Sequence, residues 1–153
     1  MKTRAKKKKA EVVEIDGQFY RVKSNGKPGV MLTHNANTLT ESAFFGMIRS
    51  ALRQASKFWK PKLLALARRE RAYTGTNKRI KREYQCECCT KWFVRAKIEV
   101  NHKIECGSLK RFEDIPEFCK RLFVEDVSLL EVLCLTCHTE TTARQKESKK
   151  NDK

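Results

Sequence analysis

The chain has 153 residues, of which 40% are hydrophobic, so its size allows one ordinary domain with extensions but no large core. Its 34 Lys and Arg residues outnumber its 18 Asp and Glu residues, which gives a formal net charge of +16. Such an excess attracts polyanions, and we expect a nucleic-acid partner; proximity to ribosomes or acidic membranes is the alternative. The sequence lacks a continuous apolar run of about eighteen residues, and no apolar segment follows its basic start. We therefore expect neither a membrane span nor a secretion signal. The expected location is intracellular, in the cytoplasm.

The first segments are predicted to be extensions of the main domain. Residues 1–10 are nearly all cationic in their central part and predict a basic disordered tail. Residues 11–33 predict a short β-hairpin extension, because two β-prone runs, 12–15 and 18–22, flank Asp16-Gly17, a dipeptide that favours two-residue hairpin turns.

Residues 34–80 predict a helical, DNA-contacting region. Thr38 and Glu41 have the spacing of a capping box, and apolar residues recur behind them at intervals of three and four. Pro61 is expected to begin a second helix. A basic belt follows, which we expect to contact the DNA backbone; a solvated helix face and linker is the alternative. The belt consists of Arg68, Arg69, Arg71, Lys78, Arg79, Lys81 and Arg82.

Two cysteine pairs predict a structural zinc site. Cys86 and Cys89 are separated by two residues, and Cys134 and Cys137 have the same spacing. Each such turn presents two sulfurs to one metal, and a buried zinc ion gives a small domain folding energy that its core cannot supply. Cys88 does not fit this spacing with either neighbour, and we interpret it as a bystander.

Histidines stand at two informative places relative to these pairs. Asn101 and His102 lie in an alternating, β-prone segment, residues 98–104, between the pairs. His138 follows the second pair at once, where a threonine-rich helical segment begins. Residues 114–123 predict a short helix between the strand and the second pair, with an apolar face that supports the fold.

The order of these motifs resembles the HNH (ββα-metal) endonuclease family, in particular its small phage-encoded members. Residues 133–138, Leu-Cys-Leu-Thr-Cys-His, look like the family's L-C-x-x-C-H motif, and residues 99–108 are similar to its V-D-H-I-x-x-x-G-S segment. The resemblance implies an α+β fold with a zinc-stapled ββα-metal domain over residues 81–145, followed by a disordered tail at 146–153. It also implies a DNA endonuclease that nicks or cuts both strands, as a monomer or a homodimer.

The same resemblance assigns roles to three residues. His102 would be the general base that activates water, because an imidazole titrates near neutral pH. Asn101 and His138 would hold a catalytic divalent cation, with Mg²⁺ or Mn²⁺ the usual ion for phosphodiester cleavage.

Two positions depart from the family pattern. Asn101 stands where the family commonly has Asp or His, and Leu129 stands where its central Asn is expected. An amide oxygen binds a cation more weakly than a carboxylate, and leucine cannot orient His102. A catalytically weak or inactive HNH scaffold that binds nucleic acid is therefore the alternative function, and a structural, ribosome-associated zinc protein is the third hypothesis.

Overall fold

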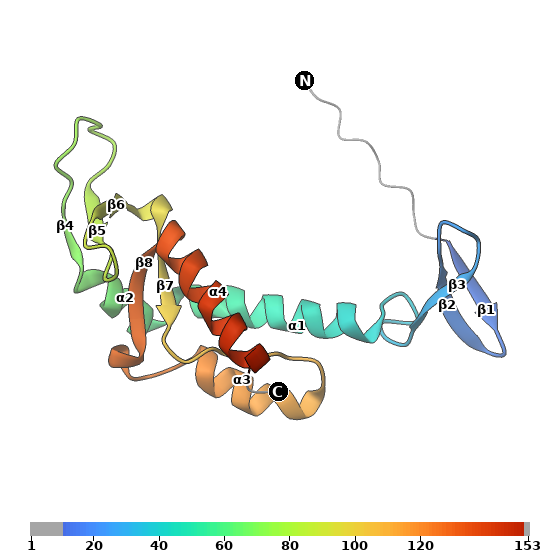
Figure 1. The fold of residues 1–153 in the computed structure, drawn as a ribbon. Helices are drawn as coiled ribbons and strands as arrows, with labels where there is room; N and C mark the ends of the chain where they lie inside the picture. Colours follow the sequence, from blue (N-terminus) through green and yellow to red (C-terminus); the bar gives the residue numbers. More distant parts are fainter. Residues whose placement is uncertain (1–10, 152–153) are drawn as a thin grey trace, which may run out of the picture. The chain divides into compact units, whose positions relative to one another are not determined.

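The computed structural model describes residues 11–151, so the basic tail predicted for residues 1–10 lies outside them. The fold is α+β, as predicted, and the described part contains three small antiparallel sheets and four α-helices (Figure 1). The sheets have the strand orders β1-β2-β3, β4-β5-β6 and β7-β8. None of the helices in residues 11–151 combines the length and the apolar character needed to cross a membrane.

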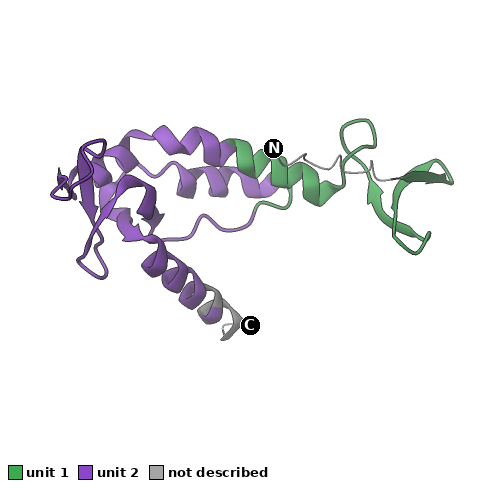
Figure 2. Ribbon diagram, turned by 90° about the horizontal axis from the view of Figure 1, so that it is seen from above, with its two compact units in different colours: residues 1–51, 109–112 green, residues 52–108, 113–153 purple. Residues whose placement is uncertain are grey.

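Two compact units make up the chain (Figure 2). Among the described residues, the first contains 11–51 and 109–112, and the second contains 52–108 and 113–151. The division falls within helix α1 (Glu41–Ala55), so it differs from the boundaries predicted at residues 33 and 80. Helical periodicity predicted the helix, but it does not indicate at which residue of the helix the contacts with one unit end and those with the other begin.

A three-stranded sheet lies in the first unit in place of the predicted hairpin. Strands β1 (Val12–Ile15) and β2 (Gln18–Val22) pair across the predicted turn, where Asp16 and Gly17 have φ angles of 51° and 75°. The third strand, β3 (Pro28–Leu32), pairs antiparallel with β2. Turn-forming residues before it close a second reversal, with Gly26 at a φ of 76°.

Helix α1 begins two residues later than the capping-box spacing suggested. The Thr40 side chain accepts a hydrogen bond from the Ala43 amide at 3.2 Å and caps the helix. Thr38 instead donates its hydroxyl to the Asn35 carbonyl, at 2.7 Å, inside a tight turn. Phe45, 2% exposed, is the buried residue of this helix.

The second unit is built around the β7–β8 pair. Strand β7 (Ile98–His102) pairs antiparallel with β8 (Leu130–Cys134), and helices α2 (Lys60–Ala67) and α4 (Leu135–Asn151) pack on the pair. As predicted, Pro61 lies in the first turn of α2, where its missing N–H costs no hydrogen bond. The buried cluster of this unit joins α2, the two strands and three cysteines; it consists of Ala65, Leu66, Tyr84, Cys86, Ile98, Leu130, Val132, Leu133, Cys134 and Cys137.

A strand lies inside the region predicted to be helical. Strand β4 (Glu70–Ala72) pairs with β5 (Arg82–Gln85), which pairs with β6 (Trp92–Val94). Partners from distant parts of the sequence stabilise β4, and local periodicity could not reveal them.

Short helices complete the second unit. Helix α3 (Ile115–Leu122) confirms the helix predicted at 114–123, and its Phe118 and Leu122 are buried. The 3₁₀ helices of this unit are η1 (Ser56–Phe58), η2 (Arg95–Lys97) and η4 (Val127–Leu129), and a fourth, η3 (Phe112–Asp114), spans the division between the units. Helix α4 continues to Asn151 and thereby corrects the disordered tail predicted from residue 146, because the Lys- and Glu-rich sequence there contains good helix formers.

Candidate active site and metal centre

Four cysteine side chains converge at the base of the β7–β8 pair. The sulfurs of Cys86, Cys89, Cys134 and Cys137 all lie within 4.8 Å of one another. In a tetrahedral site with a Zn–S length of about 2.3 Å, the sulfurs stand about 3.8 Å apart. The chemistry and spacing of the four donors therefore fit a structural metal such as zinc. Cys88 is exposed and does not belong to the cluster, as the spacing argument predicted.

Hydrogen bonds shape the first cysteine turn for thiolates. The Thr90 amide donates to the Cys86 carbonyl at 2.9 Å, and Thr90 adopts a left-handed φ of 58° to close the turn. Burial raises the pKa of the Cys86 thiol, but backbone N–H groups of Cys89, Cys134 and Cys88 donate to its sulfur and lower the pKa to about 7. The pKa of Cys137 is raised, first by its contact with the Cys134 thiol and then by burial.

Glu87 fastens this turn to the sheet. Its amide donates to the Val132 carbonyl at 2.8 Å, and its carboxylate accepts from the Val132 amide at 3.0 Å. Arg69 pairs with the other carboxylate oxygen at 3.1 Å. These bonds hold the first cysteine pair beside β8, whose last residue begins the second pair.

Strand β7 carries polar side chains toward one pocket. Successive strand residues point to opposite faces, so Glu99 and Asn101 share one face. His102, on the other face, is the last residue of the strand. Glu99, Asn101, His102 and His138 nevertheless all line the same cavity of about 460 Å³. The structure thus brings the three predicted site residues together.

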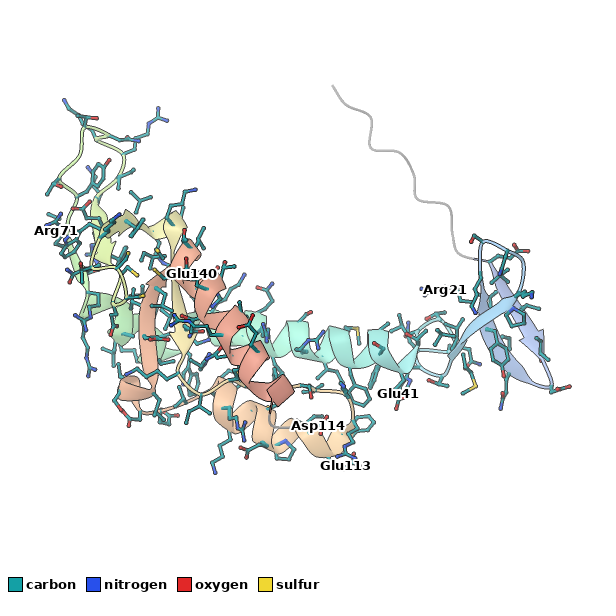
Figure 3. All side chains as sticks on the ribbon, viewed as in Figure 1. Arg21, Glu41, Arg71, Glu113, Asp114 and Glu140 are labelled. Carbon is teal, nitrogen blue, oxygen red and sulfur yellow. The ribbon has the colours of Figure 1, made fainter. Side chains whose placement is uncertain are left out.

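Glu99 is a ligand candidate beyond the predicted pair of Asn101 and His138. Its carboxylate lies 3.4 Å from His138 Nδ1, and both side chains are partly exposed. Adjacent ligands of an octahedral cation with bonds of about 2.1 Å are about 3 Å apart, so this pair fits one divalent ion. Glu140 is a second carboxylate close to His138 in the sequence, but it is exposed on α4 (Figure 3) and does not line the pocket. Glu99 lies two residues before Asn101 and therefore on the same face of the strand, and this interval is the sequence signal that could have identified it.

The amide of Asn101 is held by a carboxylate from the neighbouring strand. Its Nδ2 donates to Glu131 Oε1 at 2.8 Å, because the two residues are directly opposite in the β7–β8 register. This bond fixes the amide plane and leaves Oδ1 as the atom that could bind a cation.

His102 is oriented by a helix end. Its Nε2 lies 3.1 Å from the carbonyl oxygen of Leu122, the last residue of α3. A carbonyl only accepts, so Nε2 carries the proton and Nδ1 is the acceptor of the neutral ring. Burial lowers the pKa of His102, as do the charges of Lys62 and Arg53, whereas the Leu122 bond raises it.

Leu129, which stands at the position of the family's central Asn, makes no polar side-chain contribution here. Its backbone carbonyl accepts from the Lys103 amide at 2.9 Å, next to the end of β7. Its side chain lines a second cavity, of about 530 Å³, which it shares with His102. The group that orients His102 comes from α3 instead.

Cations from three consecutive elements line the same pocket as the polar strand residues. They are Arg53 near the end of α1, Lys57 in η1 and Lys62 in α2. None of the three belongs to the basic belt predicted from the sequence, which begins at Arg68. The turn that gathers them depends on η1, which interrupts the helical periodicity.

Three arginines of the predicted basic belt form ion pairs within the β4-β5-β6 sheet and its surroundings. Arg71, labelled in Figure 3, pairs with the buried carboxylate of Glu83 at 2.7 Å and stacks over Trp92, 3.7 Å from the ring centroid. Arg82 pairs with Glu70 at 3.0 Å, and Arg69 pairs with Glu87 as described above. These contacts give the three arginines a structural role. Contact of the belt with DNA stays a prediction.

Comparisons with protein-family models, with curated proteins and with solved structures found no match for this chain.

Proposed function

We propose that this protein is a zinc-stapled DNA endonuclease of the HNH type, with its reaction centre at the end of strand β7. The observation that carries the proposal is the cavity of about 460 Å³ that gathers an oriented histidine, a ligand set and cations. The order strand, strand, helix over β7, β8 and α4 is the arrangement that the motif resemblance implies.

The ligand set fits a hard divalent cation. Glu99 offers a carboxylate, His138 an imidazole nitrogen and Asn101 an amide oxygen, and all three line the cavity. Glu99 supplies the negative charge that Asn101 lacks. These residues would hold a Mg²⁺ or Mn²⁺ ion, which would supply Lewis-acid stabilisation of the charge that develops on the phosphate and on the leaving oxygen.

His102 acts as the general base in this proposal. The Leu122 carbonyl fixes the ring and its tautomer, so Nδ1 is the nitrogen that accepts a proton from the attacking water. The carbonyl belongs to the last residue of α3, and the negative end of a helix stabilises the imidazolium that results. This bond does the orienting that a central Asn would otherwise do.

The alternative is a zinc protein that binds nucleic acid through the same scaffold without cutting it. Asn101 itself favours this alternative, because its amide oxygen binds a cation more weakly than a carboxylate would. Affinity for DNA would survive the loss of hydrolysis.

The test is the conversion of supercoiled plasmid to nicked and linear forms with Mg²⁺, Mn²⁺ or Ni²⁺. Wild-type protein is expected to nick, and His102→Ala is expected to bind DNA without nicking. His34→Ala is the matched control, since His34 belongs to the first unit and lines neither cavity described above. If wild type and His102→Ala both bind and neither cleaves with any ion, hydrolysis is ruled out and the binding alternative holds.

A further inference from the structure

The cavity at the end of β7 is lined by basic side chains as well as by candidate metal ligands. Arg53, Lys57 and Lys62 come from three elements that follow one another between residues 41 and 67. The 3₁₀ turn η1 ends the first helix, and Pro61 starts the next one in a new direction. This change of direction allows the three basic side chains to line one cavity.

Lys62 is the most constrained of the three. Its ammonium donates to Ser56 Oγ at 3.0 Å, and that hydroxyl donates to the Arg53 carbonyl at 3.0 Å. Ser56 is 2% exposed, so a buried hydroxyl holds the half-buried ammonium in place. Ser56 accepts a hydrogen bond from one of the three N–H groups of this ammonium.

The electrostatic surroundings of Lys62 disfavour its charge in the absence of an anion. Burial lowers the pKa of Lys62, and the Arg53 guanidinium lowers it further, while the Cys106 thiol acts in the opposite direction. An anion between Lys62 and Arg53 would relieve the repulsion of the two cations and replace the water that Lys62 has lost.

We infer that Arg53, Lys57 and Lys62 form a phosphate-binding subsite that holds a phosphodiester of the DNA strand beside the candidate ligands that line the same cavity. This inference rests on the proposed function, because it places the substrate beside His102. Lys62 is the positioning residue of the subsite, and Arg53 and Lys57 add exposed charge at its rim. A phosphodiester suits it because its two non-bridging oxygens accept hydrogen bonds from different donors, and the chain's charge of +16 attracts phosphate polymers.

The test measures DNA binding by the full zinc-loaded chain without added divalent ions, so that no cleavage is needed. Fluorescence anisotropy of a short labelled duplex is recorded between about 50 and 200 mM salt. Lys62→Met removes the charge and keeps the apolar stem. We expect its affinity to fall about tenfold and the slope of log affinity against log salt to fall by about 0.9.

Lys97→Met is the matched control, because Lys97 is exposed in the same unit and does not line the cavity. It removes one charge as well, and we expect its affinity to change by less than about twofold. Equal affinities and slopes for Lys62→Met and Lys97→Met would overturn the subsite. A wild type that does not nick, combined with weaker binding by Lys62→Met alone, would remove the nuclease proposal and keep the phosphate subsite.

Zinc content and far-UV circular dichroism show whether Lys62→Met is folded. If it is not, the double variant Arg53→Gln with Lys57→Gln replaces it, since both side chains are exposed. The same loss of affinity and slope supports the subsite, and affinity equal to that of Lys97→Met refutes it.

Discussion

Serine in place of Cys134 removes one of the four sulfurs that the structure gathers within 4.8 Å. Cys134 is 4% exposed, and its amide donates to the Cys86 sulfur at 3.3 Å, so the change acts at the junction of β8 and both cysteine turns. Structural zinc contributes about 10–16 kcal/mol of apparent binding free energy in small zinc domains. A quarter of that energy, about 3 kcal/mol, is the expected cost of losing one ligand.

That cost is a large part of the free energy of unfolding, since small domains are stable by about 5–15 kcal/mol. The free energy lost with the whole zinc ion, about 10–16 kcal/mol, is at least as large as the stability of a domain at the lower end of this range. We therefore expect a strong chelator to unfold the second unit. The assay is a urea titration followed by far-UV circular dichroism, with zinc content measured by mass spectrometry.

Cys88→Ser is the matched control for this experiment, because Cys88 is exposed and lies outside the cluster. It should keep one zinc ion per chain and the unfolding midpoint of the wild type. If Cys134→Ser behaves in the same way as Cys88→Ser, or if the fold survives complete removal of zinc, the cysteines do not form a structural metal site.

Three further changes test other parts of the structure. Arg71→Met should cost about 2 kcal/mol in thermal or urea unfolding, because it removes the cationic partner of a buried carboxylate and leaves it only the Thr74 hydroxyl, whereas Arg82→Met, at a more exposed pair, should cost less than about 1 kcal/mol. Equal costs would contradict this difference in burial. Glu99→Gln should raise the Mn²⁺ concentration needed for half-maximal nicking about tenfold, and Glu140→Gln should leave it unchanged; the opposite order would remove Glu99 from the ligand set. The Asp126 carboxylate has a lowered pKa because Ser128 donates two hydrogen bonds to it, so its contribution to stability is complete above pH about 4 and is lost as the pH falls through the lowered value. Asp126→Asn should flatten this part of the pH dependence of unfolding, and an unchanged acid profile would show that Asp126 contributes nothing to it.

Local chemistry determined much of this protein from the sequence alone. The Asp16-Gly17 turn forms because its backbone needs positive φ angles, and the structure has them at both residues. Alternation predicted β7, and the apolar face at residues 115, 118 and 122 predicted α3. The two cysteine pairs predicted a cluster whose four sulfurs meet, since the spacing of each pair is a property of a few neighbouring residues.

Contacts between distant residues decided the rest. The ion pairs of Arg71 and Arg82 explain why residues 70–72 form a strand in a segment with helical neighbours, and β3 adds to a sheet only because β2 offers it an edge. The bond from His102 to the Leu122 carbonyl joins two backbone regions that the sequence keeps twenty residues apart. Arg53, Lys57 and Lys62 line one cavity because the chain turns at η1. Periodicity and spacing describe which face a side chain occupies, and only the packed structure specifies what that face meets.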